Sequence, residues 1–236
     1  MQTYLWVSLI LFFAGILQGL SGFGSVLLSI PLLAMFLDIK AVIPLAALAA
    51  VSITVIILVQ LRHQFDWQKI YPLIVGAVPG IPVGVFFLKR LDREVIHWIL
   101  GVILIVYSLY SLLSRSSPRI IGRRWAYASG FLSGCFGGAF SAGGPPVIVY
   151  MSLQEWGKDE IKVSLQGYFL AAGLLIVFLH ALSGITTFEV VRYFLVALPE
   201  LILGTYLGSL VYGRIREQSY RKVIFVVLAC LGCLMI

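Results

Sequence analysis

Residues 137–146 read Gly-Gly-Ala-Phe-Ser-Ala-Gly-Gly-Pro-Pro, and residues 19–25 read Gly-Leu-Ser-Gly-Phe-Gly-Ser. Both stretches interrupt long apolar runs, and neither contains a charged side chain. Glycine inside a helix is less favourable than alanine by up to about 1 kcal/mol, so clusters of glycine indicate close packing or unusual backbone angles. Because serines and prolines accompany the glycines, we expect unwound backbone at residues 21–25 and 141–145.

The chain around these breaks has the composition of an integral membrane protein. Of its 236 residues 61% are hydrophobic and only 11% are charged, whereas soluble domains carry roughly 25% charged residues. Ten apolar runs follow one another, at residues 4–20, 23–37, 41–61, 70–88, 95–113, 125–139, 142–153, 161–183, 188–212 and 222–236. Helices satisfy their own backbone hydrogen bonds in lipid. We therefore predict an all-α fold, a polytopic transmembrane helical bundle that forms a single domain over residues 1–236.

The net charge of +7 comes from 17 Lys and Arg against 10 Asp and Glu, most of them in short loops. Loop cations set the orientation of a membrane protein through the positive-inside rule. We therefore expect the lipid bilayer, and no nucleic acid, to be the partner of this basic chain. Cys230 and Cys233 have the spacing of metal ligands but stand alone in an apolar run, so we expect no metal, no cofactor and no catalytic residue. The sequence indicates no particular oligomeric state.

The two halves of the chain resemble each other. Four pairs lie 115 positions apart: Gly15 with Gly130, Gly19 with Gly134, Gly22 with Gly137 and Pro31 with Pro146. Farther along the offset becomes 120, where Pro79 matches Pro199 and Gly84 matches Gly204, and then 124. We infer an internal duplication, with one repeat at about residues 1–118 and the other at about 119–236.

The orientation of the two repeats depends on whether each broken segment crosses the membrane once or folds back as a hairpin. With hairpins, the loop cations divide 12 to 5 between the two faces, Lys158 and Lys162 being among the twelve; with single crossings they divide 10 to 7. The stronger asymmetry favours hairpins and two inverted repeats, with the richer face in the cytoplasm. This reading describes a multi-pass protein of the cytoplasmic (inner) membrane.

Unwound backbone at membrane depth is tolerated where protein buries it or where it lines a water-filled cavity. A helix that begins there directs free N–H groups and a positive dipole end toward the cavity, and such a site prefers an anion. The candidate substrate-binding residues are Gln18, Ser21, Gly22, Phe23, Gly24, Ser25, Ser141, Ala142, Gly143, Gly144 and Gln166. The alternatives are a purely structural role for the breaks and interhelical hydrogen bonding for the two glutamines.

Other polar and small residues have separate interpretations. Gly15-x-x-x-Gly19 and Gly130-x-x-x-Gly134 fit the small-xxx-small pattern of helix packing. Glu200 lies in the middle of an apolar run, where it would either exchange protons with the solvent and couple transport to a proton gradient, or stay protonated and bind a neighbouring helix. His180 lies near a helix end, where we expect an interfacial position.

The paired stretches at residues 19–25 and 137–146 resemble the two signature motifs of the sulfite exporter TauE/SafE family of membrane permeases. The resemblance covers essentially the whole chain, including the duplication. It implies transport of sulfite, an organosulfonate such as sulfoacetate, or a related sulfur-containing anion, which agrees with the anion site argued from helix starts.

We therefore expect a secondary transporter of a small anion, in which proton coupling through Glu200 is a further hypothesis. One alternative is a passive anion channel, which would dissipate a gradient without accumulating solute. A membrane-embedded enzyme is the weaker alternative, because the ten acidic residues are mostly scattered among loops.

Overall fold

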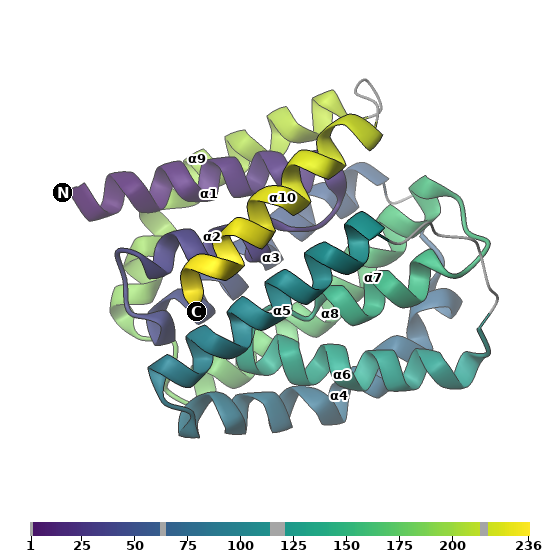
Figure 1. Cartoon of the computed structure of the whole chain (residues 1–236), viewed down its shortest axis with the longest axis horizontal. Helices are drawn as coiled ribbons and strands as arrows, with labels where there is room; N and C mark the ends of the chain where they lie inside the picture. Colours follow the sequence, from purple (N-terminus) through teal and green to yellow (C-terminus); the bar gives the residue numbers. More distant parts are fainter. Residues whose placement is uncertain (1, 62–64, 114–120, 213–216) are drawn as a thin grey trace.

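The computed structural model of the chain describes residues 2–61, 65–113, 121–212 and 217–236 (Figure 1). These residues form helices joined by short turns, with no strand among them. The helices are α1 (Gln2–Ser21), α2 (Ser25–Ala34), α3 (Ile39–Leu61), α4 (Trp67–Arg90), α5 (Arg93–Leu113), α6 (Arg123–Phe140), α7 (Gly144–Ser152), α8 (Lys158–Leu182), α9 (Phe188–Val211) and α10 (Glu217–Met235). The predicted all-α class is confirmed.

Six of these helices, α1, α3, α4, α5, α8 and α9, are long and apolar enough to cross a membrane. Two of them begin with a side-chain cap. The Asp66 carboxylate accepts the Gln68 amide at the start of α4, and the Thr187 hydroxyl accepts the Val190 amide at the start of α9. Helices α2 and α7 are much shorter, with 10 and 9 residues, and each directly follows one of the two glycine-rich breaks. Both breaks therefore end one helix and begin another.

The first helix of each half packs against the fourth helix of the other half, α1 along α9 and α6 along α4. Glycines permit this close approach. A Cβ atom at Gly15 would lie 2.8 Å from the Leu201 carbonyl oxygen, and a Cβ at Gly134 would lie 2.5 Å from the Ala77 carbonyl oxygen. The small-xxx-small prediction is confirmed, since Gly19 and Gly130 meet backbone in the same way.

The helix ends and the glycine contacts bear on the register of the predicted repeat. Helices α1 and α6 end 119 positions apart, at Ser21 and Phe140. With that offset, the contact of Gly15 with Leu201 matches the contact of Gly134 with Ala77. This offset exceeds the predicted 115 by four residues, about one helical turn. Glycines spaced four residues apart match themselves equally well after a shift of four, so the sequence pattern alone did not fix the register.

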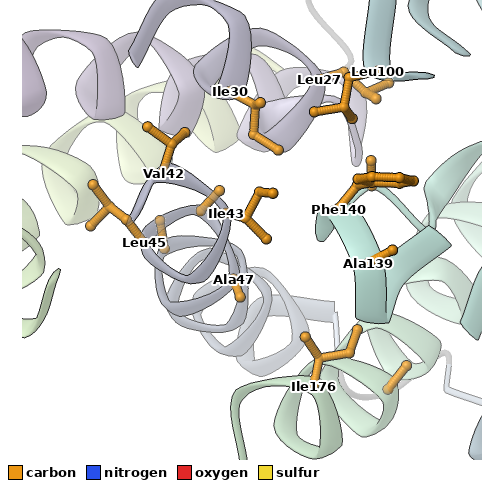
Figure 2. Packing of buried hydrophobic residues seen from close by; sticks show 14 of the residues in the cluster. Leu27, Ile30, Val42, Ile43, Leu45, Ala47, Leu100, Ala139, Phe140 and Ile176 are labelled. Carbon is orange, nitrogen blue, oxygen red and sulfur yellow. The ribbon is translucent and has the colours of Figure 1, made fainter. Parts of the chain in front are cut away.

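Helices α3 and α8 cross each other at the centre, where α3 also contacts α9 and α8 also contacts α4. Helix α5 packs against α10. Figure 2 shows the apolar core beside this crossing, where Ile30 of α2, Ile43 of α3 and Phe140 of α6 point toward one another. All three side chains are almost completely buried. This packing holds α2 and the end of α6 against the central helix α3.

Candidate functional site

The first break, between α1 and α2, turns through two glycines in the left-handed region. Gly22 has φ 83° and Gly24 has φ 97°, angles that side chains rarely adopt. The Gly22 amide donates to the Gln18 carbonyl at 2.7 Å and closes the last turn of α1. The Ser21 hydroxyl lies 2.6 Å from the carbonyl oxygens of both Leu17 and Phe23, so it fastens the loop to α1.

The second break, between α6 and α7, uses a different backbone path. Ser141 has φ 54°, and its amide donates to the Gly137 carbonyl at 2.8 Å. Its hydroxyl donates to the carbonyl of Ile43 on α3 at 2.9 Å. Gly143 has φ −72°, and the Ser133 hydroxyl donates to its carbonyl oxygen.

A cavity of about 80 Å³ lies between the two breaks. Both breaks line it, together with α3 and α8. Its polar lining side chains are Gln18, Ser25, Thr54, Ser133, Ser141 and Tyr168, and the rest of the lining is glycine, aliphatic or phenylalanine. Among the described residues, no charged side chain lines this cavity. An ion held here would be bound by dipoles and hydrogen-bond donors.

The helix starts beside the cavity carry no side-chain cap. Gly24 precedes α2 and Gly143 precedes α7, and at neither position does a side chain accept a first-turn amide. The first amides of a helix have no partner inside the helix, so they stay available to a ligand. At α7 two of these amides are missing, because Pro145 and Pro146 have no N–H.

A buried amide network supports the first break. Gln18 is 2% exposed; its oxygen accepts the Ser25 hydroxyl, and its nitrogen lies 3.5 Å from the Thr54 hydroxyl and 3.4 Å from the Gln166 oxygen. The Gln166 nitrogen donates to the Gly22 carbonyl at 2.6 Å. Gln18 thus makes the interhelical hydrogen bonds considered for it and also lines the cavity; binding of substrate by Gln18 stays a prediction.

A shorter network supports the second break. The Tyr168 hydroxyl of α8 donates to the Ser133 hydroxyl at 2.7 Å, and Ser133 in turn donates to the Gly143 carbonyl. The two breaks are therefore both held by α8 side chains, at Gln166 and Tyr168.

The structure brings most of the predicted site residues together. Eight line the cavity: Gln18, Phe23, Gly24, Ser25, Ser141, Ala142, Gly143 and Gly144. Three do not line it: Ser21, Gly22 and Gln166. The side chains of Ser21 and Gln166 bind the backbone of the first break, and Gly22 is part of that backbone. Glu200 lies apart, on the exposed side of α9.

Sequence reasoning missed several residues of this site. Thr54 and Tyr168 line the cavity from the middle of apolar helices, where no pattern distinguishes them from other helix residues. Two basic residues were also misplaced. Lys162, counted among loop cations, is 5% exposed, and His180, expected at an interface, is completely buried. Their burial depends on which helices surround α8, and the local sequence does not contain that information.

Comparison with known protein families gives a match over nearly the whole chain. A family model described as Sulfite exporter TauE/SafE matches residues 7–235 of the chain. No curated protein and no solved structure matches it.

Proposed function

The chain belongs to the sulfite exporter TauE/SafE family, and from this premise we propose that the cavity between its two helix breaks is the substrate site of a secondary transporter. The family is one of membrane transporters of sulfur anions. The substrate proposed here is sulfite or a small organosulfonate, carried across the cytoplasmic membrane.

The observation that carries this proposal is the pair of uncapped helix starts at one uncharged cavity. The N-terminal ends of α2 and α7 each bear a partial positive charge of roughly half an elementary charge. Free amides at such an end are suited to an oxyanion. Hydroxyl groups of Thr54 and Ser141 at the cavity wall add to the polar surroundings.

The size of the cavity supports a small substrate. Sites for drug-sized ligands occupy roughly 300–1,000 Å³, and a single water needs about 10–15 Å³ by the same kind of measure. A cavity of about 80 Å³ therefore has room for an ion the size of a few waters. Sulfite fits this description better than a long organic chain.

The arrangement of the helices supports inverted repeats, a finer part of the proposal. Contacts at Gly15 and Gly19 advance along α9 in the same direction as along α1, so these helices run parallel, and Gly76, Gly80 and Gly84 show the same for α4 and α6. In Figure 1, α1 and α6 enter the bundle from opposite ends. Inverted halves around one central site provide a route to alternating access.

Transport in proteoliposomes tests the proposed function. Purified protein should accumulate radiolabelled sulfite or sulfoacetate against its concentration gradient when a proton gradient or membrane potential is imposed. A passive channel would only dissipate the solute gradient. Absence of flux for every sulfur anion would contradict the proposal.

Gly144 is the position at which the site itself is best tested. A Cβ atom there would lie 3.4 Å from the Ile148 Cδ1 atom and 3.6 Å from the Phe169 Cζ atom, which is ordinary contact, and it would enter the cavity lining. We expect Gly144→Val to lower flux about tenfold or more with little change in the thermal unfolding midpoint. Gly157→Val is the control, because no atom lies within 4 Å of a Cβ at Gly157. Full flux in Gly144→Val would remove the site assignment.

A further inference from the structure

Helix α8 carries two buried basic side chains, Lys162 near its start and His180 near its end. Lys162 is 5% exposed and His180 is 0% exposed. In the part of the chain whose burial is described, no other Lys, Arg or His is buried. The stretch of α8 that lines the cavity, from Tyr168 to Ile176, lies between them. One helix therefore brings a basic group to each side of the cavity.

The two basic groups bind equivalent atoms of the two breaks. The Lys162 ammonium donates to the Gly19 carbonyl at 2.9 Å, and the His180 Nε2 atom lies 2.8 Å from the Gly138 carbonyl oxygen. Gly19 is the third residue from the end of α1, and Gly138 is the third from the end of α6. The last carbonyls of a helix have no partner within it. Lys162 and His180 each bind the carbonyl at the corresponding position, the third residue from the end, of α1 and α6.

These carbonyl ends matter because each break places the end of one helix beside the start of the next. The ends of α1 and α6 carry a partial negative charge of about half an elementary charge, equal to the positive charge at the starts of α2 and α7. Without a further group nearby, the partial negative charge of one helix end and the partial positive charge of the next helix start would largely cancel in the cavity. A cation at the carbonyl end removes that cancellation and leaves the amide end to act on the cavity.

The two caps differ in charge. The His180 Nε2 atom faces a carbonyl and so carries the hydrogen, while its Nδ1 atom is buried without a partner among the described residues. An imidazolium would bury a second N–H with no acceptor there, so His180 acts as a neutral donor. Lys162 caps its carbonyl as an ammonium and so brings a positive charge.

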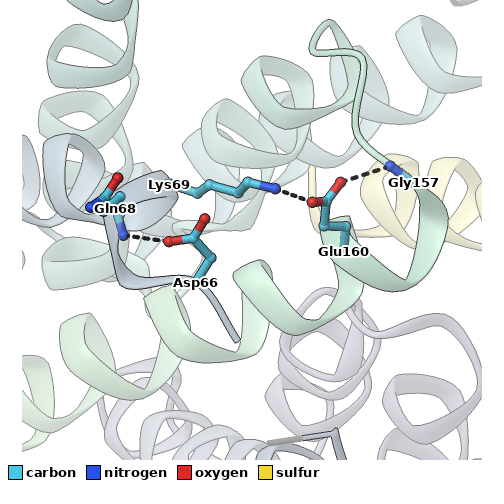
Figure 3. A network of polar contacts seen from close by, with 5 residues as sticks. All are labelled: Asp66, Gln68, Lys69, Gly157 and Glu160. Atoms are coloured by element: carbon cyan, nitrogen blue, oxygen red, sulfur yellow. Dashed lines mark hydrogen bonds and ion pairs between the residues drawn. The ribbon is translucent and has the colours of Figure 1, made fainter. Parts of the chain in front are cut away.

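The two carboxylates near Lys162 each have another partner, although Asp159 still lies close enough to attract its charge. Glu160 pairs with Lys69 of α4 and accepts the Gly157 amide (Figure 3). Asp159 accepts the Tyr212 hydroxyl at 2.6 Å. Within the described parts of the chain, no carboxylate forms an ion pair with Lys162.

The remaining contacts of Lys162 place it directly behind the first break. Its ammonium lies 3.2 Å from the centre of the Tyr212 ring. Its Cγ atom lies 2.9 Å from where a Cβ of Gly22 would be. Gly22 precedes Phe23 and Gly24, which line the cavity.

We propose that Lys162 is the charge-selecting residue of this permease, and that it acts through the end of α1 without touching the substrate. Its ammonium offsets the negative end of α1 and makes the potential in the cavity positive, so that a small oxyanion enters and a cation or neutral solute does not. His180 caps the corresponding end of α6 without adding charge. This inference rests on the proposed function.

The test measures binding of sulfite and of sulfoacetate to the purified full-length chain, by the rise in thermal unfolding midpoint with anion concentration. Lys162→Gln keeps a donor for the Gly19 carbonyl but removes the charge, and Lys162→Arg keeps both. We expect Lys162→Gln and Lys162→Met to lose about tenfold or more in affinity. Lys162→Arg should stay within about threefold of the wild-type affinity.

Lys89→Met is the control, because Lys89 is a lysine in the last turn of α4 that is exposed and does not line the cavity. It should bind as the wild type does. The unfolding midpoint without anion reports whether each variant is folded. Wild-type affinity in Lys162→Gln would overturn the inference while leaving the permease intact. A wild-type protein that neither sulfur anion stabilises would instead overturn the proposed function, and this inference with it.

Discussion

The two helix breaks meet at one cavity, yet they differ in how the backbone turns and in what they offer a ligand. The first turns through Gly22 and Gly24 at positive φ and begins α2 with amides that can all donate. The second has positive φ at Ser141, and its helix begins with Pro145 and Pro146, which cannot donate. We therefore expect the first break to be the better anion ligand, while the second would mainly add its dipole and shape the wall.

The side chains that bind the backbone of the two breaks also differ. The first break is held by the amide network of Gln18 and Gln166 and by the charge of Lys162. The second is held by hydroxyl groups of Ser133 and Tyr168 and by neutral His180. The two breaks thus have unequal chemistry, which would suit a substrate that carries its negative charge on one group.

The largest change in stability is expected at Gly143, where the second break leaves no room for a side chain. A Cβ atom at Gly143 would lie 2.5 Å from the Ser133 carbonyl oxygen and 3.0 Å from its hydroxyl oxygen. We expect Gly143→Ala to lower the free energy of unfolding by about 3 kcal/mol, because backbone must move to admit the methyl group. Unfolding in mixed detergent micelles measures this change. A larger substitution such as Gly143→Leu would lose flux through misfolding, so it does not test the site.

The control for Gly143 is Gly157→Ala, where nothing lies within 4 Å of the added atom. Its free energy of unfolding should change by less than about 0.5 kcal/mol. If Gly143→Ala is equally neutral, the second break is looser than the contacts of Gly143 indicate.

A smaller change in stability is expected at Gly24, where the first break has room for a side chain but a backbone angle that side chains rarely adopt. A Cβ at Gly24 has room, since its nearest neighbour, the Leu17 Cδ2 atom, is 3.5 Å away, but φ is 97°. We expect Gly24→Ala to lower the free energy of unfolding by about 1–2 kcal/mol. Gly24→Asn should recover part of this loss, because asparagine tolerates left-handed backbone.

Gly24→Asn also separates stability from binding. Asparagine at the position before a helix caps the first amides with its own side-chain oxygen. These are the amides proposed to hold the anion, so the variant should be more stable than Gly24→Ala and still bind sulfite more weakly than the wild type. Wild-type sulfite affinity in Gly24→Asn would argue against a role for the α2 amides.

The smallest effect on binding is expected at Glu200, which belongs to neither break. Its side chain is exposed on α9 and does not line the cavity. Proton coupling at this residue stays a prediction. Glu200→Gln should leave sulfite affinity within about twofold of wild type and abolish only the accumulation driven by a proton gradient. Unchanged proton-driven accumulation would contradict the coupling role, and a large loss of affinity would contradict the position of the site.

The sequence by itself determined the class of protein and the location of both breaks. Apolar runs of membrane-spanning length require helices, because lipid offers backbone groups no other partner. Glycine, serine and proline clusters at residues 19–25 and 137–146 marked where the helices stop. These properties are local, so a single stretch of chain contains the information.

Only the tertiary structure decided what surrounds each break. The register of the repeat, the burial of Lys162 and His180, and the cavity positions of Thr54 and Tyr168 all depend on which helix faces which. Glycines spaced four residues apart allow helices to dock one turn higher or lower with the same local pattern. From the sequence Lys162 is interpreted as a loop cation, and only the structure shows that its ammonium donates a hydrogen bond to a carbonyl 143 positions away. Long-range contacts of this kind follow from packing, and packing is a property of the whole bundle.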